Sequence, residues 1–239
     1  MTTTVKNSAL PRHDRNPQSA WRRWILAVCL VLTGWQALAT LDPAALQRQL
    51  VASFGPARVP LLKDWLRMIG SAKALGEQAK LTQVNNFVNR NIAFESDISI
   101  WQQSDYWATP LETIGQGSGD CEDFAIIKYV SLRMAGVPVN KLRLIYVKAK
   151  LQGAYGPTQQ AHMVLAYYAS PNADPLVLDN LDKTIRPASR RSDLQPVFSF
   201  NSEGIFAGVS GKDKASAGGI GRLSRWENVL RRIDAEGYE

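Results

Sequence analysis

Residues 40–239 contain one cysteine and one histidine, the two residue types that together form a thiol nucleophile and its base. The 239-residue chain has two of each, but Cys29 and His13 lie in an N-terminal segment with the features of an export signal. Cys121 and His162 are therefore the one thiol–imidazole pair that an exported form would keep. Because a cysteine nucleophile is activated by an adjacent base, this pair predicts covalent catalysis.

Cys121 lies in a sequence that predicts the start of a helix. Asp120 or Gly119 is suited to cap the helix, and apolar residues from Phe124 to Met134 continue it toward Gly136. The positive end of the helix dipole favours a thiolate at such a position. The backbone N–H of Cys121 can also donate to an oxyanion, and Trp107 or Gln116 could supply the second donor.

A carboxylate that could orient the imidazole follows 17 residues after His162. His162 opens one predicted strand, Asp179 ends the next, and Ser170-Pro171-Asn172 supplies the turn between them. Residues so placed can be neighbours on adjacent antiparallel strands. Cys121, His162 and Asp179 then form a triad in which the thiolate attacks a carbonyl carbon and the imidazolium protonates the leaving amine.

Three acidic side chains surround the predicted nucleophile. Asp120, Glu122 and Asp123 would raise the pKa of the thiol unless their charge is balanced. They could serve only the helix, since acids in a first turn each contribute about 0.3–1 kcal/mol. Alternatively, they could bind a hard cation such as calcium together with carbonyl oxygens. A zinc site is poorly supported, because one cysteine and one histidine supply too few soft ligands.

The elements expected around these residues give an α+β fold, a helix carrying the nucleophile packed on an antiparallel sheet. A polar, aromatic-rich loop is expected over 96–119, and a turn over 153–159. The other expected elements are a helix opening at Asp42-Pro43, helices over 59–74, 77–90 and 120–136, and strands over 142–148, 162–169 and 175–181.

The N-terminal segment predicts export. Arg22-Arg23 precedes an uncharged apolar run from Trp24, and Ala37-Leu38-Ala39 offers a peptidase site, so residues 1–39 form a signal peptide with an unstructured lead. Cleavage would place the protein in the periplasm. An uncleaved anchor is the alternative, since residues 24–41 just reach the shortest membrane span. Because Arg22 and Arg23 are adjacent, export by the twin-arginine pathway is an alternative to export by the general secretory pathway.

The mature chain is nearly neutral and long enough for one domain. Five of the 28 basic and one of the 21 acidic residues lie before Thr40, which leaves a net charge of +3 for residues 40–239. This balance gives no support for nucleic-acid binding. We expect one catalytic domain over 40–203. Residues 204–239 are expected to form a mobile Gly-rich segment and a C-terminal amphipathic helix, which docks on the domain or binds a partner.

Four sequence blocks resemble the bacterial transglutaminase-like cysteine proteinases: 106–113, 117–125, 161–164 and 178–180. The resemblance covers about Leu41 to Phe200. It implies a papain-like or transglutaminase-like core, the same triad, and dependence on calcium, with Asp120 and Glu122 as the first expected ligands and Asp123 next.

The resemblance also implies a substrate and a regulator. The substrate would be the N-terminal region of a large surface adhesin, cut at a di-alanine site so that the adhesin is released and a biofilm disperses. The regulator would be an inner-membrane receptor that senses cyclic di-GMP and sequesters the protease with its periplasmic domain.

Three function classes are compatible with these residues. The first is a cysteine endopeptidase. The second is an amidase or acyl transferase that uses the same thioester, whose fate depends on pocket shape and water access. The third is a binding module that has lost catalysis, against which the complete Cys, His and Asp set argues.

Overall fold

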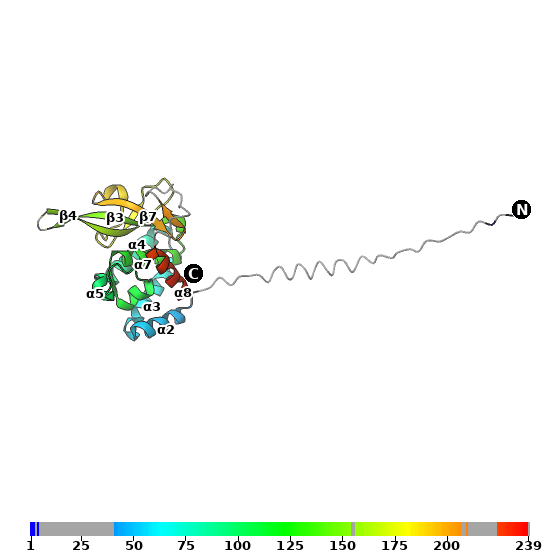
Figure 1. Cartoon of the computed structure of the whole chain (residues 1–239), viewed down its shortest axis with the longest axis horizontal. Helices are drawn as coiled ribbons and strands as arrows, with labels where there is room; N and C mark the ends of the chain where they lie inside the picture. Colours follow the sequence, from blue (N-terminus) through cyan, green and yellow to red (C-terminus); the bar gives the residue numbers. More distant parts are fainter. Residues whose placement is uncertain (3, 5–40, 154–155, 207–208, 210–223, 239) are drawn as a thin grey trace. The chain divides into compact units, whose positions relative to one another are not determined.

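The computed structural model describes residues 1, 2, 4, 41–153, 156–206, 209 and 224–238 (Figure 1). The chain divides into two units, Met1–Thr40 and Leu41–Glu239. This boundary lies one residue beyond the predicted signal-peptide cut after Ala39, and nearly all of the signal peptide lies outside the described residues. Within the part that is described, no helix combines the length and apolarity needed to cross a membrane.

A central helix, α7 (Cys121–Met134), organises the second unit. Its residues from Asp123 to Leu132 are all buried, as expected of a helix that is covered on every side. Three earlier helices lie against it: α3 (Val59–Ala72), α4 (Glu77–Asn91) and α6 (Pro110–Gln116). α2 (Pro43–Phe54) packs in turn on α3 and α6.

Apolar stripes and one buried polar contact fix these helices. Leu62, Trp65 and Ile69 recur at helical spacing on α3 and are buried in the main core. The indole N–H of Trp65 donates to Ser131 Oγ on α7 at 2.8 Å. The boundaries predicted for α3, α4 and α7 are met to within about two residues.

A six-stranded antiparallel sheet lies beside the helices, in the order β6-β5-β4-β3-β7-β8 (Figure 1). Together they confirm the predicted α+β fold class. The face of β4 that carries Met163, Leu165 and Tyr167 packs in the main core with α7. The strands are β3 (Leu142–Gly153), β4 (Gly156–Tyr167), β5 (Leu176–Leu178), β6 (Arg186–Pro187), β7 (Leu194–Asn201) and β8 (Gly204–Phe206).

β3 and β4 form a hairpin much longer than predicted. Their ladder runs from Leu142 opposite Tyr167 to Gly153 opposite Gly156, and its outer end extends away from the helices (Figure 1). The chain reverses within the predicted turn over 153–159, but that prediction is too long, because the exposed residues from Gly156 on pair across the hairpin. As a result, His162 lies inside β4 rather than at its start.

The predicted loop over 96–119 is also wrong in part. It contains α5 (Asp97–Trp101), α6, and β2 (Ser118–Gly119), which pairs in parallel with β1 (Ala93–Phe94). α6 begins with a complete capping box in which Thr109 and Glu112 exchange hydrogen bonds, with Pro110 in the first turn. Two residues that remain irregular, Gln102 and Asp105, have φ of 57° and 61°, a region that side-chain-bearing residues rarely adopt.

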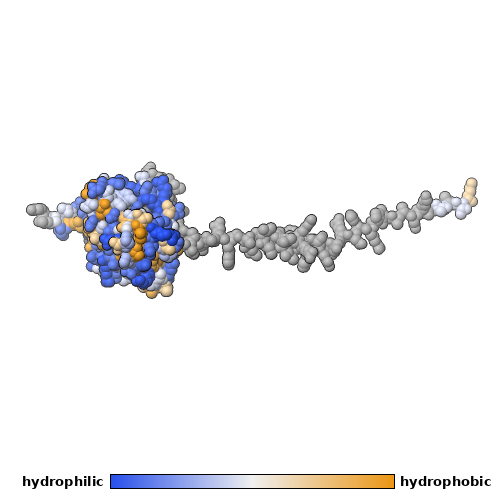
Figure 2. Space-filling model, turned by 90° about the horizontal axis from the view of Figure 1, so that it is seen from below, coloured by the Kyte–Doolittle hydropathy of each residue, from blue (hydrophilic) through white to orange (hydrophobic). Residues whose placement is uncertain are grey.

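The C-terminal helix, α8 (Ser224–Glu236), docks on the same unit rather than standing apart. Trp226, Val229 and Ile233 are buried along one face, and the Trp226 indole donates to Asn201 O at 3.1 Å. Of the predicted Gly-rich mobile segment, Gly204–Phe206 forms β8, while most of the rest lies outside the described residues. The face in Figure 2 is mainly hydrophilic, with apolar side chains in small groups.

Candidate active site

Cys121 is the first residue of α7, and the sequence around it builds the helix start. Asp120 has extended backbone angles and accepts from the N–H of Glu122, while the side chain of Asp123 accepts from the N–H of Asp120. This capping box uses two of the acids that surround the nucleophile. Gly119 is needed just before it, since a Cβ there would lie 2.7 Å from both Cβ and Oδ2 of Asp123.

The surroundings of the Cys121 thiol favour its protonated form. Cys121 is half-buried, and its Sγ donates to Glu122 Oε2 at 2.7 Å. Burial raises the pKa of the thiol, the charge and hydrogen bond of Glu122 and the charge of Asp120 add to the rise, and the Met163 N–H opposes it. The direction is opposite to the one that the helix dipole alone predicts, because burial and the nearby carboxylates together outweigh the dipole.

His162 and Asp179 are brought together in the interior. Both are 2% exposed, and His162 Nε2 lies 2.8 Å from Asp179 Oδ1. Asp179 follows the last residue of β5, and Leu178 pairs with Leu165. Continuing that register one residue would place Asp179 opposite Val164, so His162 is its diagonal neighbour. Because Nε2 faces the carboxylate, Nδ1 is the ring nitrogen left for the thiol.

Several groups besides His162 hold Asp179 in place. Its Oδ2 accepts from Arg191 at 2.7 Å, and its Oδ1 from the N–H of Leu181 at 3.0 Å. Its backbone carbonyl accepts from Lys128 Nζ and Asn89 Nδ2, each at 2.9 Å. Burial would raise the pKa of Asp179, but the hydrogen bonds and charges of His162 and Arg191 outweigh it and hold the pKa well below its usual range.

Lys128 connects the two halves of the site. It lies seven residues after Cys121 on α7, is 1% exposed, and reaches the carbonyl of Asp179. Burial lowers the pKa of Lys128 to about 7, and the charge of Asp179 works against that shift. The helix that presents the thiol thus also anchors the loop that presents the carboxylate.

The thiol lies beside the strand that carries the imidazole. The Met163 N–H, the next backbone group after His162, interacts with Cys121, and Tyr146 pairs with Met163 across the hairpin. Within the described residues no hydrogen bond joins the thiol to the ring. Contacts of this kind are often long in a free enzyme and shorten when substrate binds.

The two side chains predicted as second oxyanion donors differ in availability. The Trp107 indole N–H donates to Asp105 Oδ1 at 3.0 Å and the ring stacks on Phe200, so this donor is already engaged. Gln116 is the last residue of α6, and its carbonyl accepts from Arg58. The side-chain amide of Gln116 makes no hydrogen bond with any other described residue. The N–H of Cys121 remains at the helix start as predicted.

A residue that the sequence reasoning missed joins the acidic cluster. Carboxylate oxygens of Asp97, Asp120 and Asp123 all lie within 4.8 Å of one another, while Glu122 groups with Asp120 and the thiol. Asp97 begins α5 and is 5% exposed. Its Oδ2 accepts from the N–H of Tyr106, and its buried Oδ1 has no partner among the described residues.

The protonation behaviour of the cluster shows how crowded it is. Burial and the charge of Asp120 raise the pKa of Asp97 to about 6. The pKa of Asp120 is raised by burial and by Glu122, and that of Asp123 by burial and by Asp120. Several oxygens, one of them orphaned, converge without a positive partner, and this donor set fits a calcium ion. Asp97 lies 23 residues before Asp120, so no local spacing could have indicated it.

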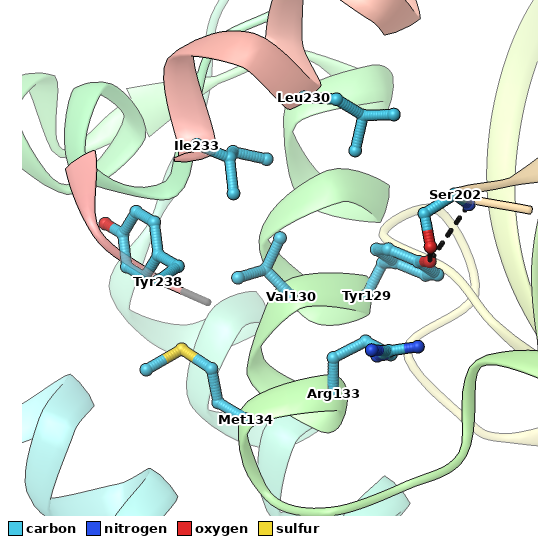
Figure 3. A pocket seen from close by; sticks show the side chains of 8 residues that line it. All are labelled: Tyr129, Val130, Arg133, Met134, Ser202, Leu230, Ile233 and Tyr238. Atoms are coloured by element: carbon cyan, nitrogen blue, oxygen red, sulfur yellow. Dashed lines mark hydrogen bonds between the residues drawn. The ribbon is translucent and has the colours of Figure 1, made fainter. Parts of the chain in front are cut away.

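A cavity of about 330 Å³ lies elsewhere on α7 (Figure 3). Tyr129, Val130, Arg133 and Met134 line one side of it from α7, while Leu230 and Ile233 face them from α8. None of the triad residues lines this cavity. It belongs to the junction between the two helices and not to the candidate site around Cys121 and His162.

Arg191 offers a test of this geometry. Arg191→Met would leave the buried carboxylate of Asp179 without its cationic partner, which typically costs about 3–5 kcal/mol. We expect urea unfolding at pH 7 to show this loss. The exposed neighbour provides a control, since Arg190→Met should stay within about 0.5 kcal/mol of the parent.

The stabilisation by the Asp179–Arg191 pair should depend on pH in a defined direction. A depressed pKa contributes stability above the ordinary value of 3.8, and this contribution is lost as the pH falls toward the folded-state pKa. The difference between parent and Arg191→Met should therefore shrink below pH 3.8. Equal stability of Arg191→Met and Arg190→Met at pH 7 would contradict the assigned role.

Known proteins provide an independent comparison. Residues 70–193 match the family model described as bacterial transglutaminase-like cysteine proteinase. Legionella pneumophila LapG is similar at 36% identity, over 80% of this chain and 97% of that chain, with a TM-score of 0.63. Its calcium-bound form is 36% identical over 80% of this chain and 99% of that chain, with a TM-score of 0.64. Its EGTA-treated form is 35% identical over 80% of this chain and 97% of that chain, with a TM-score of 0.65. None of the curated proteins matches. The chain belongs to the bacterial transglutaminase-like cysteine proteinase family and is a cysteine peptidase.

Proposed function

We propose that this peptidase is a calcium-dependent periplasmic endopeptidase that cuts the N-terminal region of a large surface adhesin at a di-alanine site. Cutting would release the adhesin and disperse a biofilm. The similarity to LapG over 97% of that protein's chain carries the proposal. The buried His162–Asp179 pair beside the helix that begins with Cys121 supports it from the chemistry.

The reaction follows from the three side chains. His162 takes the proton of the Cys121 thiol, and the thiolate attacks the scissile carbonyl carbon to form a tetrahedral oxyanion. The N–H of Cys121 donates to that oxyanion. The intermediate collapses to a thioester as His162 protonates the leaving amine, and water then hydrolyses the thioester. Asp179 fixes the ring orientation and stabilises the imidazolium.

The acidic cluster supports the calcium requirement. Asp97, Asp120 and Asp123 would hold the ion, with Glu122 beside them. A bound calcium ion would neutralise carboxylates that otherwise disfavour an anionic sulfur. The existence of calcium-bound and EGTA-treated forms of LapG adds support. Asp120 and Asp123 also cap α7, so the groups that would bind the ion are the groups that shape the nucleophile's turn.

The proposed regulator is an inner-membrane receptor of the LapD type that senses cyclic di-GMP and sequesters the peptidase with its periplasmic domain. The support for this partner is the family resemblance and the predicted export. A pull-down with the receptor's periplasmic domain would test it.

Export gives the first prediction that tests this proposed function. If residues 1–39 are removed on secretion, the periplasmic fraction should contain a protein whose N-terminal sequence begins at Thr40. Replacing Ala37 and Ala39 with bulky residues should block processing and leave a membrane-bound precursor. Recovery of a chain that retains residues 24–41 would favour the uncleaved anchor.

The nucleophile gives the second prediction. Cys121→Ala should abolish cleavage of an adhesin fragment and leave thermal unfolding unchanged, because the side chain is small and only half-buried. A fragment whose two alanines are replaced by valines should resist the parent enzyme. Adding a labelled primary amine distinguishes the classes, since an endopeptidase yields a cut and an acyl transferase yields an adduct. Cleavage by Cys121→Ala would refute the mechanism.

Chelation gives the third prediction. EGTA should stop cleavage, and added calcium but not magnesium should restore it. Asp97→Asn should raise the calcium concentration for half-maximal activity by about tenfold, because a charged ligand is lost. Asp64→Asn is the control, since Asp64 is exposed and its ion pair among the described residues is with Arg67, away from the cluster. Full activity in EGTA would remove the calcium requirement but leave the triad intact.

A further inference from the structure

The segment that faces the acidic cluster contributes two backbone donors to it. The N–H of Tyr106 donates to Asp97 Oδ2 at 2.5 Å, and the N–H of Ala108 donates to Asp123 Oδ1 at 2.7 Å. These two residues flank Trp107, so a single stretch of three residues orients carboxylates from two separate helices. The position of that stretch therefore determines how Asp97 and Asp123 face each other.

The stretch belongs to no helix or strand. The residue before it, Asp105, has φ of 61°, and Gln102 has φ of 57°. Residues that carry side chains rarely adopt such backbone conformations, which persist only where surrounding contacts enforce them. Besides the hydrogen bond from the Trp107 indole to Asp105, several contacts that enforce them come from elsewhere in the fold.

They come from α8. The Arg232 guanidinium donates to Tyr106 Oη at 2.8 Å, to the Trp107 carbonyl and to Glu112 Oε2, and it lies 4.9 Å from the centre of the Tyr106 ring. Arg225, two turns earlier, donates to the Asp105 carbonyl at 3.0 Å and pairs with its carboxylate at 2.9 Å.

Further contacts bind the same two segments. Thr109 Oγ1 donates to Glu236 Oε1 at 2.7 Å. Phe200 packs on one side against Trp107, with ring centres 5.8 Å apart, and on the other against Trp226 of α8, at 5.4 Å. α8 and residues 105–109 are thus joined directly by polar contacts and, through Phe200, by aromatic packing.

We propose that Arg232 is a positioning residue for the calcium site: by holding Tyr106 and Trp107 from α8, it orients Asp97 and Asp123 toward the ion. Docking of α8 and binding of calcium are then coupled, and each strengthens the other. The inference rests on the calcium requirement of the proposed function. The helix lies outside residues 70–193, the part that matches the family model.

Calcium affinity of the purified full chain, measured by calorimetric titration, tests the proposal. Coupled sites typically affect each other 5- to 150-fold, and we expect Arg232→Met to weaken calcium binding about tenfold. Arg232→Lys keeps the charge but not the fork that reaches three acceptors, and should fall between parent and Arg232→Met. Arg231→Met, at an exposed neighbour on the same helix, should bind like the parent.

Thermal unfolding with and without calcium distinguishes a positioning role of Arg232 from a general loss of stability in the variant. The increase in melting temperature on adding calcium should be smaller in Arg232→Met than in Arg231→Met, when each is compared with its own EGTA-treated sample. An equal calcium affinity in these two variants would overturn the inference alone. Absence of calcium binding by the parent chain would overturn it together with the calcium part of the proposed function.

The reciprocal effect needs no variant. Because coupling between two sites is mutual, calcium should slow amide hydrogen exchange in residues 224–236 of the parent chain. Slower exchange there supports the proposal even if Arg232→Met proves unstable. Exchange in α8 that is the same with calcium and with EGTA would overturn it.

Discussion

The burial of negative charge is the constraint on which the rest of this structure depends. An ionised carboxylate inside a protein must be paired or must bind a metal, or its charge is lost by protonation. Asp179 is paired: Arg191 and His162 surround its oxygens, and its pKa stays low. Within the described residues no ion pair reaches Asp97, Asp120 or Asp123, and their pKa values are raised. The negative charge of Asp179 is thus balanced by neighbouring groups, whereas that of the Asp97, Asp120 and Asp123 cluster is not balanced by any described residue.

α7 connects these two sides. Its first turn carries the thiol and two of the crowded acids, and seven residues later Lys128 reaches the carbonyl of Asp179. The helix is buried on all sides, so it cannot shift without disturbing the sheet and the neighbouring helices. A buried central helix therefore sets the spacing between Cys121 and the strand that carries His162, while the more irregular 102–109 segment sets the surroundings of the acids.

Local patterns in the sequence explain what could be predicted. Cys121 and the acids beside it were identified because capping residues and apolar spacing act over a few residues, and the pairing of His162 with Asp179 followed from two strands and a turn. The capping box at Thr109 and Glu112 was equally local, but the glycines and aromatic residues around it favoured a loop. The length of the β3–β4 hairpin is not evident from β4, because residues 156–161 are almost all exposed and show no apolar–polar alternation, although residues 147–152 of β3 do alternate.

The residues that could not be predicted act through tertiary contacts. Asp97 and Arg191 reach the site only after folding brings distant segments together, and nothing in their own surroundings distinguishes them from surface charges. The raised pKa of the thiol has the same origin. The helix start alone predicts the opposite direction, and the sum of burial and neighbouring charges appears only in three dimensions.

The close approach of Gly119 to Asp123 restricts how this chain can evolve. Any side chain at position 119 would begin with a carbon 2.7 Å from the Cβ of residue 123, and every amino acid except glycine has that Cβ. Shortening the acid would not make room, and glycine at 123 would weaken the first turn of α7. A side chain is therefore not accommodated at position 119, and no compensating substitution at position 123 makes room for one without weakening the helix that begins with Cys121.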